Sequence, residues 1–167
     1  MYEIDIQNES ANAVNEPRLR EAVTTVLTQH TVADGTAVTI VFTGNDEVAA
    51  LNRQYRGVDS PTDILSFPAD KPPVEIPDEP PYLGDLIIAY PYASAQAQTE
   101  GHSLDDSLAL LVVHGSLHLL GYDHDTKERR AAMWAEQEKA LRVLNVPLDI
   151  VPALEGDSHD ESLEEDP

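Results

Sequence analysis

The chain has 167 residues, the usual length of one domain that can bury a core of its own. It has no cysteine and no apolar run of about 18 residues, which excludes disulfides, thiolate metal sites and a membrane-spanning helix. Its 31 acidic and 10 basic residues give a net charge of -21, which opposes broad binding to nucleic acid or to anionic membranes.

The first half of the chain alternates between predicted strands and helices. In chain order these are strand 2–6, helix 17–30, strand 37–43, helix 45–57, and strands 63–67 and 83–90. Pro17 suits a helix start, and β-branched residues dominate 37–43, as a strand requires. Asn45 is expected to cap the second helix, and Gly57 to end it.

A proline-rich loop and an acidic tail stand outside this pattern. Residues 69–82, with Pro68 directly before them, carry six of the twelve prolines, which indicates a stiff surface loop. Residues 155–167 hold seven acids and no lysine or arginine, which is typical of a disordered tail. We therefore expect one domain at residues 1–154 and a tail at 155–167. The N-terminus has no signal-peptide pattern, so we expect a soluble cytoplasmic protein.

The last third is predicted to be helical. The expected helices cover residues 91–100, 103–120 and 127–144. Ser103, with Asp106 three residues on, resembles a capping box. The helix that it begins is apolar almost all round, so it should be central and buried. The order of elements predicts an α+β fold in which a mixed sheet of about four strands is covered by about five helices.

Three histidines at the end of the central helix form the candidate site, in the segment His114-Gly-Ser-Leu-His118-Leu-Leu-Gly121-Tyr-Asp-His124. His114 and His118 are four residues apart, so their rings share one helix face. Gly121 suits a left-handed helix end, after which the chain can return His124 to the same point. Three converging neutral imidazoles make an open tetrahedral site, which predicts one Zn²⁺ per chain. The same ligands also suit nickel and other transition metals.

Two other interpretations of these histidines are weaker. As ordinary core residues, His114 and His118 would each need a separate polar partner in an apolar setting. The spacing is also that of the metzincin proteases, which carry a glutamate general base directly after the first histidine. Gly115 occupies that position, so the group that transfers the proton is missing and a metalloprotease is disfavoured.

The histidine segment and two further blocks resemble the YbeY family of bacterial endoribonucleases, also called rRNA maturation factors. The blocks are LNRQYRGVDSPTDILSFP at residues 51–68 and LGDLI at residues 83–87, in the family's order. The resemblance spans roughly residues 37–145. It implies a single-domain α+β metalloprotein that cleaves single-stranded RNA. The implied role is processing of ribosomal RNA, notably the 3′ end of the small-subunit RNA, and ribosome quality control.

By residue, the resemblance implies that His114, His118 and His124 are the zinc ligands. It implies that Arg56 faces the metal and the RNA phosphate. A guanidinium is a permanently charged planar fork that suits phosphate oxygens. From the sequence alone, Arg56 could equally form a surface ion pair with Asp59 or Asp63.

Three carboxylates are candidates to orient a ligand ring, with a purely structural role as the alternative: Asp63, Asp85 and Asp123. The motif contains no obvious general base. A different class of function also fits a zinc site, namely a ribosome-assembly factor that is stabilised by zinc and does not cut RNA.

The distribution of charge limits how RNA can be bound. Residues 127–142 carry five bases against three acids, directly after the histidines: Lys127, Arg129, Arg130, Lys139 and Arg142 against Glu128, Glu136 and Glu138. Elsewhere acids dominate, so we expect weak affinity for free RNA. We expect targeting to come from the small ribosomal subunit or a ribosome-associated protein.

Overall fold

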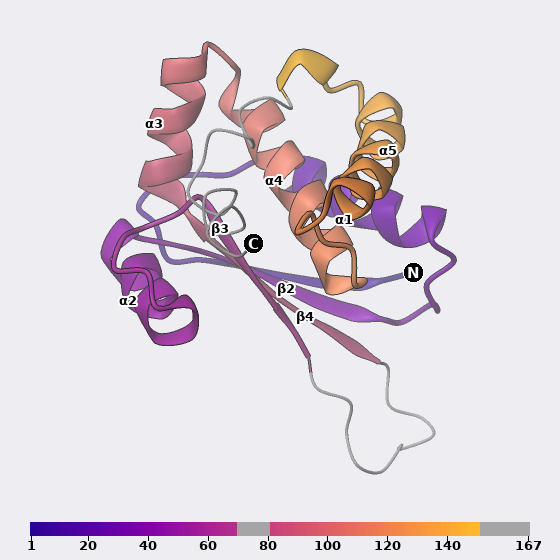
Figure 1. Ribbon diagram of the computed structural model, residues 1–167, viewed down its shortest axis with the longest axis horizontal. Coiled ribbons are helices and arrows are strands. Elements are labelled where there is room, and N and C mark those ends of the chain that lie inside the picture. The colour runs from indigo at the N-terminus through magenta and orange to yellow at the C-terminus, as the bar shows by residue number, and fades with distance from the viewer. Residues whose placement is uncertain (70–80, 151–167) are drawn as a thin grey trace.

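A four-stranded mixed sheet forms the centre of the computed structural model, which describes residues 1–69 and 81–150 (Figure 1). The strands are β1 (Glu3–Asn8), β2 (Ala37–Thr43), β3 (Ile64–Pro68) and β4 (Tyr82–Ala89). They lie in the order β1-β2-β4-β3. β1, β2 and β4 are parallel, and β3 is an antiparallel edge strand paired with β4.

Five α-helices surround this sheet within the described residues: α1 (Glu16–Gln29), α2 (Asn45–Arg56), α3 (Tyr90–Glu100), α4 (Leu104–Leu119) and α5 (Lys127–Val143). A short 3-10 turn, η1 (Leu148–Ile150), follows them. The predicted single α+β domain with a mixed sheet and helical cover is thereby confirmed. Most of the predicted proline-rich loop and all of the predicted acidic tail lie outside the described residues. Across the part of the chain that is described, no helix combines the length and the apolar character needed to cross a membrane.

α4 is the central helix, as its apolar composition predicts. It contacts α1, α3, α5, β3 and β4, so apolar side chains are buried on every side of it (Figure 1). Its start is capped as expected, because the Ser103 side chain accepts a hydrogen bond from the Asp106 backbone N–H at 3.1 Å. The histidines near its other end therefore sit on a well-anchored element.

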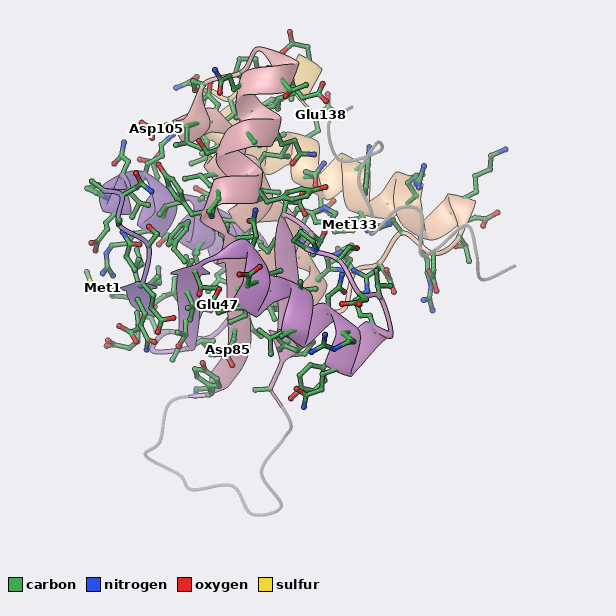
Figure 2. All side chains as sticks on the ribbon, turned by 90° about the vertical axis from the view of Figure 1, so that its left-hand side faces the viewer. Met1, Glu47, Asp85, Asp105, Met133 and Glu138 are labelled. Atoms are coloured by element: carbon green, nitrogen blue, oxygen red, sulfur yellow. The ribbon has the colours of Figure 1, made fainter. Side chains whose placement is uncertain are left out.

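α2 covers the opposite face of the sheet from α4. Successive side chains of a strand point to opposite faces, and in β4 Leu86 belongs to the main core while Ile87 packs under α2. Val48 of α2 meets Leu65 of β3 in this smaller apolar cluster. Figure 2 views the molecule from this side, with Glu47 marking the first turn of α2 in front of the strands. Near the other end of α2, the Tyr55 ring contacts the Phe67 ring of β3, so the last turn of α2 also lies beside β3.

The prediction that Asn45 caps α2 is wrong. Gly44 occupies the cap position and α2 has no side-chain cap. The Asn45 side chain instead accepts a hydrogen bond from the Tyr92 backbone N–H, at 3.0 Å. Tyr92 lies in the first turn of α3, whose own cap residue Ala89 offers no side-chain acceptor. Asn45 therefore caps a neighbouring helix across space, which local sequence cannot reveal.

Replacing Gly84 with alanine is expected to destabilise the domain by at least about 2 kcal/mol. Gly84 has φ +148°, and an added Cβ would overlap the Phe67 carbonyl oxygen and lie 2.8 Å from Leu119 Cδ2. Urea unfolding measures the loss. Gly101→Ala is the matched control, because Gly101 also has a positive φ, +76°, but open space around its Cβ position. Equal losses in the two variants would contradict the role of close packing at Gly84.

Candidate metal centre

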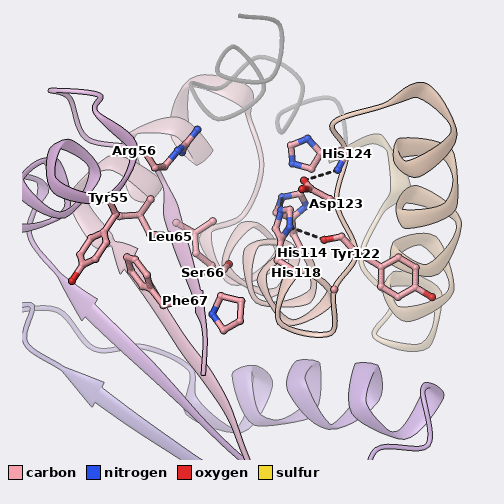
Figure 3. Close-up of a pocket in the computed structure, with 13 residues that line it drawn as sticks. Tyr55, Arg56, Leu65, Ser66, Phe67, His114, His118, Tyr122, Asp123 and His124 are labelled. Carbon is pink, nitrogen blue, oxygen red and sulfur yellow. Dashed lines mark hydrogen bonds between the residues drawn. The ribbon is translucent and has the colours of Figure 1, made fainter. Parts of the chain in front are cut away.

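The predicted site residues line one cleft of about 590 Å³. One wall is formed by the end of α2 and by β3, with Tyr55, Arg56, Leu65 and Phe67 (Figure 3). The other wall is formed by the end of α4 and the turn after it. It contributes five labelled residues: His114, His118, Tyr122, Asp123 and His124. The antiparallel edge strand β3 thus brings segments about 60 residues apart in the sequence face to face.

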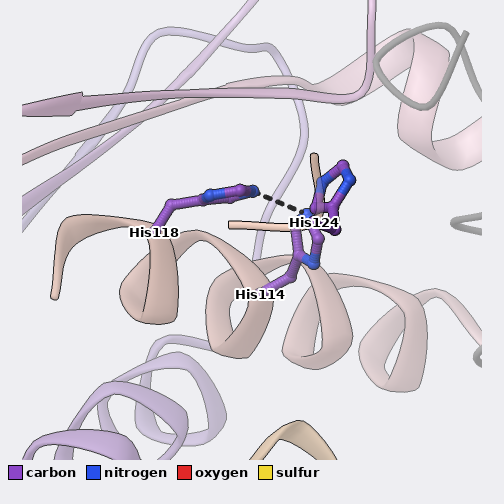
Figure 4. A group of neighbouring side chains, drawn as sticks. All are labelled: His114, His118 and His124. Atoms are coloured by element: carbon purple, nitrogen blue, oxygen red, sulfur yellow. Dashed lines mark hydrogen bonds between the residues drawn. The ribbon is translucent and has the colours of Figure 1, made fainter. Parts of the chain in front are cut away.

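The three predicted histidines converge (Figure 4). Each offers one ring nitrogen, and these nitrogens all lie within 4.8 Å of one another. His114 Nε2 and His118 Nε2 are 3.1 Å apart. Two nitrogens bound to one tetrahedral zinc at about 2.0–2.1 Å would lie about 3.3 Å apart. The spacing of the ring nitrogens therefore fits a single small cation.

The hydrogen bonds of the rings also point to a cation. The second nitrogen of His118, Nδ1, is 2.9 Å from the Tyr122 carbonyl oxygen, and that of His114 is 3.1 Å from Gln137 Oε1. A carbonyl oxygen only accepts, so each Nδ1 carries the proton and each Nε2 presents a lone pair. Two lone pairs that face each other at 3.1 Å repel unless a proton, as in the hydrogen bond drawn in Figure 4, or a metal cation lies between them. The donor set therefore fits a metal ion such as zinc.

A tight helix end returns His124 to this point. Gly121 has φ +100°, the left-handed conformation predicted for it. The Gly121 N–H donates to the His118 carbonyl oxygen and the Tyr122 N–H to the Leu117 carbonyl oxygen, each at 3.0 Å. This is the pair of hydrogen bonds of a Schellman motif. Asp123 then accepts from the His124 backbone N–H at 2.8 Å, which fixes the turn.

The cleft holds few formal charges. Among its described lining residues, Arg56 is the only lysine or arginine and Asp123 the only carboxylate. Arg53, three residues before Arg56, lies outside the lining and pairs with Asp59 at 3.4 Å. Of the two arginines in the last turn of α2, Arg56 thus lines the cleft and Arg53 does not.

The other candidate carboxylates lie elsewhere. Asp63 is fully buried and accepts hydrogen bonds from the Ile64 backbone N–H and the Thr62 hydroxyl. The Asp85 carboxylate accepts a hydrogen bond from the Tyr82 hydroxyl on the exposed part of β4. Neither lines the cleft, and these hydrogen bonds go to groups other than the three histidine rings.

Two residues near the histidines are missed by motif reasoning. Gln137 of α5 is fully buried and holds the ring of His114. Trp134, one turn earlier, packs at 5.8 Å from His114 and 5.5 Å from His124, measured between ring centroids. The signal for Gln137 is its place on the apolar face of α5 beside Met133 and Ala140, where a polar side chain needs a partner.

The basic stretch of α5 is largely neutralised. Three of its five bases form ion pairs: Arg129 with Asp125, Lys139 with Glu136, and Arg142 with Glu138. The hydrogen bond from Lys139 lowers the pKa of Glu136, which keeps that carboxylate charged. These ion pairs reduce the positive charge that α5 offers to phosphates.

Comparison with known proteins identifies relatives over nearly the whole described domain. Residues 3–145 match the family model described as "Endoribonuclease YbeY". A protein of that name from Chloroflexus aurantiacus is 41% identical over 151 residues, covering 88% of this chain and 98% of its own. Another from Geobacillus kaustophilus is 47% identical over 115 residues, covering 66% of this chain and 74% of its own.

A solved structure shares the fold. The solution structure of TM1509 from Thermotoga maritima superposes with a TM-score of 0.58 and 26% sequence identity. The match covers 84% of this chain and 88% of that protein. The arrangement of strands and helices that builds the cleft is therefore found in an experimentally determined relative.

Proposed function

Since the chain belongs to the YbeY family of endoribonucleases and is thus an RNA hydrolase, we propose that it is a zinc-dependent enzyme that cuts single-stranded ribosomal RNA. The proposed substrate is the precursor at the 3′ end of the small-subunit RNA, and the proposed setting is the small ribosomal subunit and its quality control. The observation that carries the proposal is the convergence of His114, His118 and His124 opposite Arg56 in one cleft.

The three histidines, the groups that hold two of their rings, and Arg56 each have a defined task in this proposal. His114, His118 and His124 would hold the ion, with the Gln137 side chain and the Tyr122 carbonyl fixing two of the rings. When bound, zinc supplies a Lewis acid that draws charge from the phosphodiester and acidifies water. Arg56 binds the phosphate oxygens from the opposite wall, where its fixed charge offsets the negative charge that develops during cleavage.

Gln137→Leu is expected to weaken zinc binding about 10- to 100-fold, because the His114 Nδ1–H loses the acceptor that orients the ring. Competition with a chromophoric chelator measures the affinity. Gln137→Glu keeps an acceptor oxygen at this place and is expected to retain most of the affinity. An unchanged affinity in Gln137→Leu would refute the orienting role of Gln137.

The experiment that tests the proposed function uses a small-subunit RNA precursor in two forms, single-stranded and annealed to its complement. The purified zinc-loaded protein is expected to cut the single-stranded form and to leave the duplex intact. Mapping of the cut positions tests the assignment to the 3′ end. Binding to small-subunit particles without cleavage of either RNA form would overturn the proposal in favour of an assembly factor that does not cut.

A further inference from the structure

Tyr55 presents an exposed aromatic ring in the lining of the cleft. Within residues 1–69 and 81–150, only four large apolar side chains are exposed, and Tyr55, at 61%, is the one that lines the cleft. The other exposed tyrosine, Tyr82, uses its hydroxyl in hydrogen bonds to Thr39 and Asp85 outside the cleft. An aromatic face left open to water beside a polar site is characteristic of a surface that binds a ligand.

The Tyr55 ring is held in place by its neighbour. It meets Phe67 edge to face, with ring centroids 5.1 Å apart and planes at 66°. Phe67 in turn packs on the small apolar cluster of Val48, Leu65 and Ala89 between α2 and β3. The ring is therefore preformed, and binding on its free face loses little conformational entropy.

Tyr55 also stands next to the phosphate-binding group. Arg56 follows it directly in the last turn of α2, and both line the wall opposite the histidines (Figure 3). In that view Tyr55 and Phe67 lie at one end of the wall and Arg56 at the other. A nucleotide whose phosphate lies between Arg56 and the histidines can place a neighbouring base at the aromatic end of the wall.

The negative charge of the protein means that RNA binding needs an uncharged contact, such as that of a base with the Tyr55 ring. Arg56 is the only lysine or arginine in the described lining of the cleft, and the net charge of the chain is -21. Phosphate contacts alone therefore give little affinity. Stacking of a base on an aromatic ring is uncharged, tolerates any sequence and needs a base that is free of its own duplex.

We propose that Tyr55, positioned by Phe67, is a stacking platform for a nucleobase next to the scissile phosphate. The proposal rests on the proposed function and names how the same cleft selects unpaired RNA. A paired base cannot turn onto this ring without breaking its stack, so the platform favours single strands.

The test combines protein variants with an altered substrate. Tyr55→Ala is expected to raise KM for a short single-stranded RNA about 5- to 150-fold with little change in kcat, and Tyr55→Phe to behave like the wild type. The substrate is then made with one abasic nucleotide, moved in turn through each position beside the cut. At one position, the abasic nucleotide is expected to raise the KM of the wild type as much as the Tyr55→Ala substitution does. The same substrate is expected to raise the KM of Tyr55→Ala no further. Tyr82→Ala is the matched control outside the cleft and should match the wild type on every substrate.

Two results would overturn the proposal that Tyr55 is a stacking platform. One is an equal KM for the wild type and Tyr55→Ala. The other is that every abasic substrate raises KM equally in the two proteins. Binding of a labelled, cleavage-resistant 2′-O-methyl RNA by fluorescence anisotropy keeps the test independent of catalysis. If the wild type binds this RNA through Tyr55 but cuts nothing, the proposed nuclease function fails and the platform stands. If the wild type cuts RNA and Tyr55→Ala binds equally well, the platform fails and the nuclease stands.

Discussion

Replacing His118 with alanine is expected to lower kcat/KM for RNA cleavage about 10³-fold and to reduce the zinc content from about one ion per chain to near zero. His118 offers one of the three ring nitrogens that converge in the described part of the chain, so its loss leaves two of these ligands, too few to retain a catalytic zinc. A Lewis acid contributes several kcal/mol to the transition state, and about 4 kcal/mol corresponds to 10³-fold in rate.

The controls separate loss of metal from loss of fold. Within the described residues the His118 ring is hydrogen-bonded to the backbone at the Tyr122 carbonyl, and loss of one such bond costs about 1 kcal/mol, so the chelated variant is expected to remain folded in an unfolding measurement. His102→Ala, outside the lining of the cleft, should keep both zinc and activity. A metal-free His118→Ala protein that cuts RNA at the wild-type rate would contradict the proposed role of the ion.

Arg56→Ala is expected to fold normally, to bind zinc normally and to cut RNA about 10²- to 10³-fold more slowly, because the charge that meets the phosphate is lost. Arg56→Lys is expected to recover only part of the rate, since an ammonium lacks the planar fork. Single-turnover cleavage at saturating protein measures the chemical step. Arg53→Ala is the matched control, because Arg53 lies in the same turn, outside the lining of the cleft, and pairs with Asp59 at 3.4 Å.

A rate of Arg56→Ala equal to that of the wild type would remove Arg56 from catalysis. If the protein is instead a zinc-stabilised assembly factor, two different results are expected. His118→Ala would unfold, and neither the wild type nor Arg56→Ala would cut RNA.

The parts of this molecule that sequence predicts well are those fixed by neighbouring residues. The spacing of His114 and His118 places two rings on one helix face, and Gly121 permits the turn that returns His124. The apolar sequence of α4 requires a central position, because such a helix is stable only when surrounded. These three signals suffice to locate the candidate metal centre.

The parts that sequence does not predict depend on contacts across space. Asn45 caps α3 instead of its own helix because β4 places the two helix starts side by side. Gln137 supports His114 from 23 residues away, and only the packing of α5 on α4 brings them together. Asp63 lies in the same sequence block as Arg56, yet it is fully buried and lies outside the lining of the cleft. Tyr55 becomes notable only once its exposure beside the cleft is known.

The measurement that tests the central claim most directly is the rate of single-stranded RNA cleavage as zinc is added back to chelated wild-type protein. One ion held by His114, His118 and His124 predicts a rate that starts near zero, rises in proportion to bound zinc and levels off at one ion per chain. Cleavage by the chelated protein at the rate of the loaded protein would contradict the claim.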